Sequence, residues 1–172
     1  MASEEFLYFG YASNLLRERL LLKNPSATFV AIAKLEDYKL VFGQKSTGVS
    51  PVWKGGVASI EYSQGDHVWG VVWKLNRCHL QTLDLQESSH EGIEVNTKMS
   101  TGEILTCRVY VMRDMSSQLP PHPNYLDIII KGAVQNKLPP DYITMLRSVE
   151  DNGSAETTEI YLEVMKLLGP TV

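Results

Sequence analysis

One candidate for a catalytic side chain in this sequence is Glu87. It follows Gln86 at the end of a leucine-rich segment and precedes Ser88-Ser89-His90. A positioned carboxylate can act as a general acid or base. A solvated carboxylate at a helix end is the simpler interpretation, because glutamate is rarely buried. A lone carboxylate therefore establishes no function by itself.

The second candidate is the loop between an apolar run and the helix formers that follow it. Residues 6–11 have the length and character of a strand buried on both faces. The N–H groups at a helix start are unpaired and the dipole is positive there, so this loop could bind an anion. Gly10, Ala12 and Ser13 are small enough to let a ligand approach the backbone. An ordinary turn capped by Ser13 or Asn14 is the alternative, since most such turns bind nothing.

Metal-dependent hydrolysis, serine hydrolysis and nucleotide chemistry find little support in the sequence. It contains no Gly-x-Ser-x-Gly motif and no glycine-rich phosphate loop. Its histidines and cysteines lack the paired spacing of metal ligands, so we expect no metal site. These residues are His67, His79, His90, His122, Cys78 and Cys107.

The composition is that of one globular domain, which we place at residues 1–172. Hydrophobic residues make up 44% and charged residues 21% of the chain, which excludes disordered and low-complexity classes. A net charge of −4 with no basic run makes nucleic acid a poor partner. The apolar stretches are far too short to cross a bilayer, so we expect no membrane association.

The N-terminus and the cysteine content favour a cytoplasmic location. The stretch Met1-Ala2-Ser3-Glu4-Glu5 is acidic where a secretory signal needs basic residues and then an apolar run. Two cysteines are too few for a disulfide framework, which makes a reducing compartment the expected one.

Strand patterns dominate the first two thirds of the chain. The strand over residues 6–11 should be central in its sheet, and a helix over residues 15–20 should stop before Asn24-Pro25. Leu80, Leu83 and Leu85 are predicted to face inward from a short helix. The further elements are one or two strands over 27–42, a hairpin of 55–60 and 67–73 turning at 63–66, that helix over 76–87, and a second hairpin of 93–99 and 104–112.

Helical patterns dominate the last third. Pro120-Pro121-His122-Pro123 predicts a rigid connection, because proline cannot continue a helix or a central strand. Segregated strands and helices favour an α+β fold over alternating βαβ units, with a helical part at about residues 124–168. Helices are predicted over 125–136, 140–150 and 156–168, the last with Ile160, Val164, Leu167 and Leu168 on one face.

An ordered series of motifs resembles the γ-glutamylcyclotransferase family over roughly residues 5–150. The family opens with Tyr-Gly-Ser-Asn after a hydrophobic strand, and this chain has Tyr11-Ala12-Ser13-Asn14 after Phe6-Leu7-Tyr8-Phe9-Gly10. One short motif is a weak signal, whereas many in the same order are specific. The later matches are Arg19 with Asn24-Pro25-Ser26-Ala27, Lys39-Leu40 with Phe42-Gly43, Trp53 with Gly55-Gly56, the run from Val68 to Lys74, Leu83-Asp84 with Gln86-Glu87, Thr106-Cys107-Arg108 with Tyr110, Pro123 with Tyr125, and Gly132-Ala133.

This resemblance implies an α+β fold around a small mixed, barrel-like sheet, with the loop after the first strand forming one wall of a pocket. It implies an enzyme of the lyase or acyltransferase type that releases 5-oxoproline and a free amino acid from a γ-glutamyl amino acid, within glutathione metabolism. The reaction would need no metal and no organic cofactor, and similarity alone implies a homodimer. By position, Glu87 would be the general acid/base, and the substrate-binding residues would be Tyr8, Phe9, Gly10, Tyr11, Ala12, Ser13, Asn14 and Tyr125.

The chemistry of cyclisation fits these positions. Holding the γ-glutamyl group curled, with its amine near the γ-carbonyl, supplies much of the catalysis as orientation. The attacking amine must lose a proton and the departing amine must gain one, so Glu87 could serve both steps. Backbone N–H groups of residues 11–14 are the natural donors to the tetrahedral oxyanion.

Two departures from the family pattern leave a second hypothesis open. The family order Ala-Tyr-Gly-Ser-Asn is here Gly10-Tyr11-Ala12-Ser13-Asn14, so a positive φ in this loop would strain Ala12 unless Gly10 has taken over that conformation. The segment between Glu87 and Ile93 is about four residues shorter than in the family, and a displaced catalytic group loses rate steeply.

The alternatives are a catalytically weak or inactive paralogue that acts as a binding or regulatory protein, and a relative acting on γ-glutamylamines or glutathione. The ordered motifs resemble the γ-glutamyl amino acid branch more than the relatives acting on γ-glutamylamines or glutathione.

Overall fold

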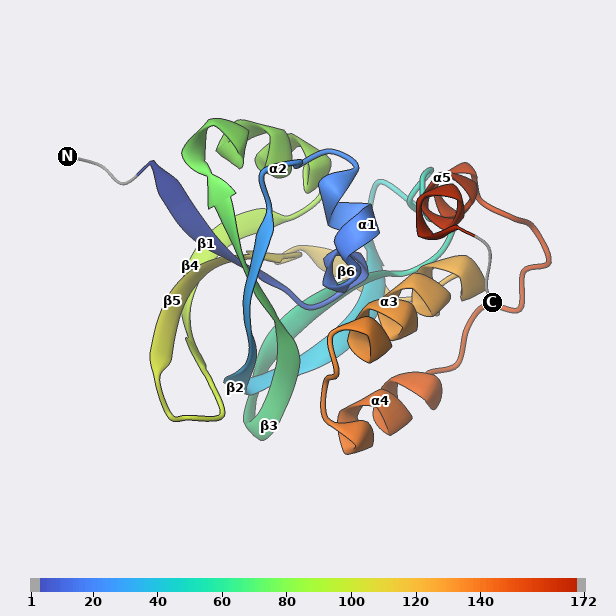
Figure 1. The fold of residues 1–172 in the computed structure, drawn as a ribbon. Helices are drawn as coiled ribbons and strands as arrows, with labels where there is room; N and C mark the ends of the chain where they lie inside the picture. Colours follow the sequence, from blue (N-terminus) through green and yellow to red (C-terminus); the bar gives the residue numbers. More distant parts are fainter. Residues whose placement is uncertain (1–3, 170–172) are drawn as a thin grey trace.

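The computed structural model of the protein describes residues 4–169 and contains a closed β-barrel with helices against its outside (Figure 1). The expectation drawn from Met1–Glu5 and the ends of the predicted domain 1–172 lie partly outside the described residues. The strands are β1 (Glu5–Gly10), β2 (Thr28–Lys45), β3 (Val57–Asn76), β4 (Glu91–Lys98), β5 (Ile104–Val111) and β6 (Met115–Gln118). The helices are η1 (Ser13–Leu15), α1 (Arg17–Leu21), η2 (Arg77–His79), α2 (Leu80–Gln86), α3 (Pro123–Gln135), α4 (Pro140–Arg147) and α5 (Glu159–Leu168).

The barrel closes because β2 pairs with both ends of the strand series. Neighbouring strands follow the order β3-β1-β5-β4-β2, and β2 also pairs with β3, while β6 extends the sheet from β2. The β1–β5 pair is parallel and the others are antiparallel, so the expected mixed, barrel-like sheet and α+β class are confirmed. Closure leaves few free strand edges. The prediction that residues 6–11 form a central strand is confirmed, since β1 lies between β3 and β5.

The predicted hairpin that turns at residues 63–66 is wrong. The strand β3 runs without a break through this stretch and pairs along its length with β2. The register shifts opposite Asp37, which has φ 65° and accepts a hydrogen bond from Gly65 N–H at 3.0 Å. The polar turn residues therefore form an irregularity inside one long ribbon. The hairpin loop lies instead at residues 46–56.

The second predicted hairpin, formed by β4 and β5, is confirmed. The short helix before it is confirmed in place, but its predicted face is wrong in part. Leu83 is buried and Leu80 is half-buried, whereas the side chain of Leu85 is 69% exposed. A helix of seven residues after the 3-10 turn makes too few turns to bury three leucines on one side.

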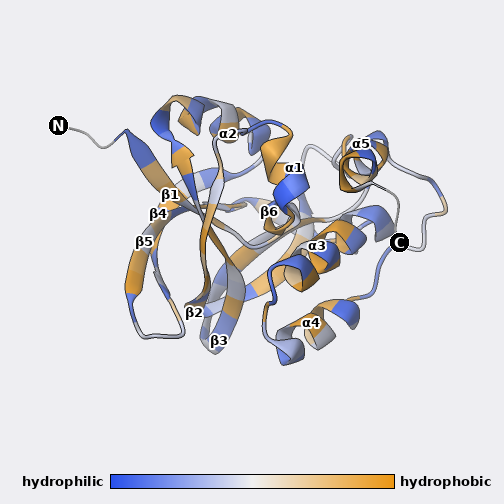
Figure 2. Ribbon diagram, viewed as in Figure 1, coloured by the Kyte–Doolittle hydropathy of each residue, from blue (hydrophilic) through white to orange (hydrophobic). Residues whose placement is uncertain are grey.

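The last third is helical as predicted, with the helices gathered against the outside of the barrel (Figure 1). Pro123 starts α3, and His122 caps it by accepting a hydrogen bond from Asn124 N–H at 2.9 Å. Figure 2 shows hydrophobic and hydrophilic residues alternating along α3 and α5, as amphipathic helices require. In α5 the predicted face is wrong at Leu167, which is 53% exposed, while Val164 is buried. Within residues 4–169, no helix is long and apolar enough to cross a membrane.

The helix α3 presses directly on the loop that follows β1. A Cβ added to Gly132 would lie 2.5 Å from the backbone nitrogen of Leu16 and 2.6 Å from Leu15. Two side chains fasten the contact, since Asn136 Nδ2 donates to the Leu15 carbonyl at 2.7 Å and Gln135 accepts from Arg17 N–H at 3.0 Å. The position of this loop is thereby set from outside the barrel.

We predict that Gly132→Ala destabilises the protein even though alanine favours helices by about 1 kcal/mol over glycine. The added methyl group meets backbone that cannot move freely, so we expect a net loss of about 1–3 kcal/mol in urea unfolding. Val134→Ala, at an exposed position of the same helix, is the control and should change stability little. A neutral or stabilising Gly132→Ala would contradict the close approach.

Candidate active site

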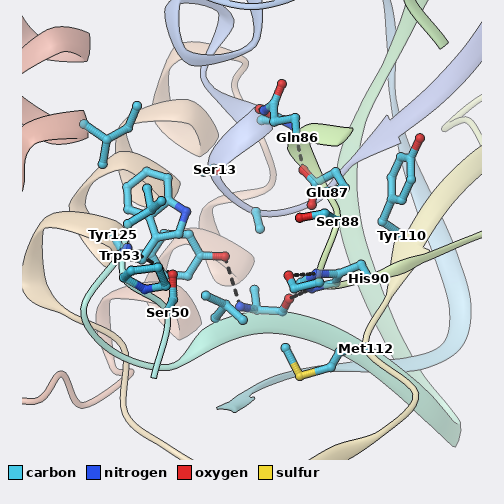
Figure 3. A pocket seen from close by; sticks show the side chains of 18 of the residues that line it. Ser13, Ser50, Trp53, Gln86, Glu87, Ser88, His90, Tyr110, Met112 and Tyr125 are labelled. Atoms are coloured by element: carbon cyan, nitrogen blue, oxygen red, sulfur yellow. Dashed lines mark hydrogen bonds between the residues drawn. The ribbon is translucent and has the colours of Figure 1, made fainter. Parts of the chain in front are cut away.

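A cavity of about 1100 Å³ opens between the loop after β1, the end of α2, the loop between β2 and β3, and parts of α3 and α5. Figure 3 shows Glu87 and His90 on one side of this cavity, and Trp53 and Tyr125 across from them. The predicted site residues that line it are Tyr8, Tyr11, Ala12, Ser13, Asn14, Glu87 and Tyr125.

Glu87 lies half-buried directly after α2, at the point where the helix ends. The helix is held against β5 by Asp84, which accepts hydrogen bonds from Arg108 Nε at 3.2 Å and Nη2 at 2.9 Å and from the Tyr110 hydroxyl. This anchor one turn before Glu87 fixes the direction from which its carboxylate enters the cavity. The Glu87 side chain itself lines the cavity.

Asn14 joins the loop after β1 to this carboxylate. Its Nδ2 donates to Glu87 Oε1 at 3.1 Å and to the Tyr8 hydroxyl at 2.9 Å. Its carbonyl accepts a hydrogen bond from Trp73 Nε1 at 3.0 Å, and the residue is only 2% exposed. The prediction that Ser13 or Asn14 caps the following helix is wrong, because α1 starts after Leu16 and no side chain caps it.

The two small residues of this loop, Gly10 and Ala12, have different steric surroundings. Ala12 has φ −123°, and Gly10 has no positive φ, so neither of the two expected backbone conformations occurs. A Cβ on Gly10 would lie 2.8 Å from the carbonyl oxygen of Asn14 and 3.3 Å from Trp73 Nε1. Glycine is required at position 10 because the Asn14 backbone crosses it closely.

Aromatic side chains form the opposite wall. The ring of Tyr125, on α3, lies 4.7 Å from the ring of Trp53, and its hydroxyl accepts a hydrogen bond from Ala58 N–H at 3.0 Å. Burial raises the pKa of Tyr125, so its hydroxyl stays neutral. Trp53 lies in the loop between β2 and β3. This loop carries Trp53 to the cavity wall.

The carboxyl group of Glu87 sits in an environment that favours its neutral form. Burial raises its pKa, and the nearby charges of His90 and Arg19 oppose that rise. His90 belongs to the short segment after Glu87, and its Nε2 donates to the Ala58 carbonyl at 2.8 Å, while Nδ1 lies 2.8 Å from Ser89 Oγ. The segment after Glu87 thus brings an imidazole close enough to act electrostatically on the carboxylate.

Two predicted site residues do not line the cavity. Phe9 is completely buried and packs against the backbone of Gly70, because alternate residues of β1 point to opposite faces. Gly10 acts through the close approach of Asn14. Sequence reasoning assigned no site role to Arg19, Trp53, Gln86 or His90, which also line the cavity. Arg19, Trp53 and Gln86 belong to the ordered motifs, and this could have marked them as site residues. His90 belongs to none of these motifs.

Comparison with known proteins gives a consistent result. A model of the AIG2-like family matches residues 67–146. The gamma-glutamylcyclotransferases of Homo sapiens and Bos taurus are each 48% identical to this chain over 153 residues, which cover 87% of this chain and 81% of the relative. A solved structure of a gamma-glutamyl cyclotransferase superimposes with a TM-score of 0.91 at 43% identity, covering 95% of this chain and 99% of the other.

We predict unequal losses of stability for exchanging alanine and glycine at the two small positions of the loop. Gly10→Ala should destabilise the protein by about 1–3 kcal/mol, because the Asn14 backbone must shift. Ala12→Gly should cost less than about 1 kcal/mol, since φ at Ala12 is negative and no strain is relieved. Urea unfolding of both variants measures the difference, and a larger loss for Ala12→Gly would show that the loop geometry is wrong.

Proposed function

The chain belongs to the γ-glutamylcyclotransferase family, and we propose that it releases 5-oxoproline and a free amino acid from γ-glutamyl amino acids by intramolecular cyclisation. In this proposal Glu87 is the general acid/base. The observation that carries it is the 3.1 Å hydrogen bond between Asn14 and Glu87, which brings the loop after β1 and one carboxylate to the same cavity. A curled γ-glutamyl group in this cavity would meet both at once.

Glu87 is suited to move the proton that cyclisation requires. The α-amine nitrogen attacks the γ-carbonyl carbon, and its proton passes to the Glu87 carboxylate. The new ring C–N bond forms first, and the bond to the leaving nitrogen then breaks while Glu87 returns the proton to that nitrogen. The raised pKa of Glu87 brings its basicity closer to the working pH, which favours both transfers.

The loop after β1 supplies donors for the negative charge that develops on the γ-carbonyl oxygen. Among residues 4–169, the N–H groups of Ala12 and Ser13 have no hydrogen-bond acceptor, although both residues line the cavity. Donors that are already oriented stabilise an oxyanion without reorganising during the reaction. This supports the assignment of these two groups to the oxyanion.

The aromatic wall of Trp53 and Tyr125 would hold the aliphatic part of the γ-glutamyl chain in its curled form. A cavity of about 1100 Å³ is at the upper end of small-molecule sites, so room remains for the side chain of the leaving amino acid. Orientation of this kind can account for much of the rate of an intramolecular reaction.

The further parts of the proposal concern the setting in which the enzyme acts. We propose that it works without metal or organic cofactor, in the cytoplasm, as part of glutathione metabolism and as a homodimer. The exposed Cys78 and the buried Cys107 are both free thiols, which agrees with a reducing compartment. The dimer rests on the family resemblance.

We predict that Glu87→Gln lowers 5-oxoproline release from γ-glutamyl-alanine by about 100- to 10,000-fold, because the amide cannot accept the amine proton. The thermal midpoint should stay near that of the wild type. The control is Glu91→Gln, which removes only an exposed carboxylate paired with Arg113.

Near wild-type turnover by Glu87→Gln would remove Glu87 from the mechanism. A wild-type protein that is folded but releases no 5-oxoproline would instead favour the inactive, binding or regulatory paralogue.

We also predict a pH dependence of kcat/KM that reports the pKa of Glu87. As the pH falls through this raised pKa, the carboxylate becomes protonated and activity is lost, so the acid limb should lie above the ordinary glutamate range. His90→Ala should move the limb to still higher pH, because the charge of His90 favours the carboxylate. His67→Ala, at an exposed position, should leave the limb unchanged. An acid limb at the ordinary glutamate value would contradict the assignment.

A further inference from the structure

Arg19 is a buried cation in the cavity wall that has no ion-pair partner within residues 4–169. It lies on α1, is only 7% exposed and lines the cavity. Its guanidinium stacks over the ring of Trp53, with 5.5 Å from Cζ to the ring centroid. Among the described residues 4–169, it forms no ion pair with any carboxylate.

The hydrogen bonds of this guanidinium are also incomplete. One terminal atom of the Gln86 amide lies 3.2 Å from both Nη1 and Nη2 of Arg19 and accepts from both when it is the oxygen. The Nε of Arg19 is buried and has no acceptor. Glu87 and Glu163 act on Arg19 electrostatically, but neither reaches it. A buried charge is costly unless it is paired, so a partner from outside the chain is expected here.

We propose that Arg19 binds the α-carboxylate of the γ-glutamyl group and thereby selects substrates that carry it. This inference rests on the proposed function and adds a specificity-determining residue to it. The planar guanidinium presents parallel N–H donors that match the two oxygens of a carboxylate. Stacking on Trp53 fixes the plane of the guanidinium, which reduces the entropy lost when the carboxylate binds.

A γ-glutamyl amino acid carries two carboxylates, the α-carboxylate of the glutamyl group and that of the leaving amino acid. The position of Arg19 relative to Glu87 favours the first as its ligand. The Gln86 atom that faces Arg19 also lies 3.3 Å from Asn14 Oδ1, and Asn14 Nδ2 contacts Glu87 Oε1. Arg19 therefore lies near Glu87, with the side chains of Gln86 and Asn14 between them, while its stacking on Trp53 places it where the wall of Glu87 meets the aromatic wall. The α-amine and the α-carboxylate share one carbon atom, so an amine directed at Glu87 brings its own carboxylate toward Arg19. The carboxylate of the leaving amino acid lies beyond the scissile bond.

The test compares Arg19→Gln with the wild type on three substrates. These are γ-glutamyl-alanine, its analogue with the glutamyl α-carboxylate converted to a carboxamide, and γ-glutamyl-alaninamide. On the first and third substrates we expect kcat/KM to fall about 10- to 100-fold, mainly through KM. The carboxamide analogue lacks the carboxylate that Arg19 would bind, so the wild type should already turn it over poorly. On this analogue, kcat/KM of the variant should be close to that of the wild type. Arg17→Gln, an exposed arginine on the same helix, should match the wild type throughout.

Two results would overturn the assignment. An equal loss on all three substrates would mean that Arg19 acts on the structure of the site, and a loss that disappears only with γ-glutamyl-alaninamide would assign Arg19 to the leaving amino acid. If Arg19→Gln does not fold, Arg19→Lys keeps the charge without the paired donors, and the same pattern across the substrates is expected.

A binding measurement separates this inference from the proposed function. The product 5-oxoproline retains the α-carboxylate, and 2-pyrrolidinone is the same ring without it. We expect 5-oxoproline to raise the thermal midpoint of the wild type but not of Arg19→Gln, and 2-pyrrolidinone to make no distinction between them. If the wild type turns over no substrate but shows this binding pattern, the proposed function is wrong and the anion site at Arg19 is supported. If 5-oxoproline raises the thermal midpoint of both proteins equally, or of neither, the proposed anion site at Arg19 is wrong.

Discussion

The site depends on one buried carboxamide, that of Asn14. Its side chain donates to Glu87 and to Tyr8, and its main-chain oxygen accepts from Trp73. Asn14, Tyr8 and Trp73 are almost fully buried and Glu87 is half-buried, and a buried polar group that loses its partner costs about 1–3 kcal/mol. The loop after β1 can therefore take only the conformation that satisfies them together. This conformation is sterically possible because Gly10 has no Cβ to meet the Asn14 backbone and Gly132 of α3 has none to meet Leu15 and Leu16.

The same network places the Glu87 carboxyl group and the Arg19 guanidinium at the cavity. The Glu87 carboxyl group is buried enough for its pKa to rise, yet it faces the cavity and lies near His90 and Arg19. These neighbours limit the rise, which keeps a base available. For Arg19 the effects are reversed: burial lowers its pKa, and the charges of Glu87 and Glu163 oppose that fall, but no carboxylate among the described residues forms an ion pair with it. In our proposal a substrate that brings an anion to Arg19 and an amine to Glu87 completes the charge balance of the cavity.

Local patterns in the sequence predicted most of the elements but not their partners. The apolar run at residues 6–11 predicted a central strand, which is found, and the helix predicted over 125–136 is found as α3, although it begins two residues earlier, at Pro123. The turn chemistry of residues 63–66 was misleading, because the pairing of β2 with β3 overrides it. Asparagine is a common helix-capping residue, so the sequence predicted a cap at Asn14. Only the fold shows that its side chain donates to Glu87 and Tyr8 instead. The charge of Arg19 likewise gave no sign that the residue would be buried without an anion.

The most direct test of this account is a crystal structure of the Glu87→Gln variant with γ-glutamyl-alanine bound. We expect the α-amine beside the side chain of residue 87 and the γ-carbonyl oxygen within hydrogen-bond distance of the N–H groups of Ala12 and Ser13. The aliphatic part should lie against Trp53 and Tyr125. A substrate bound with its γ-carbonyl directed away from the loop after β1, or outside this cavity, would contradict the account.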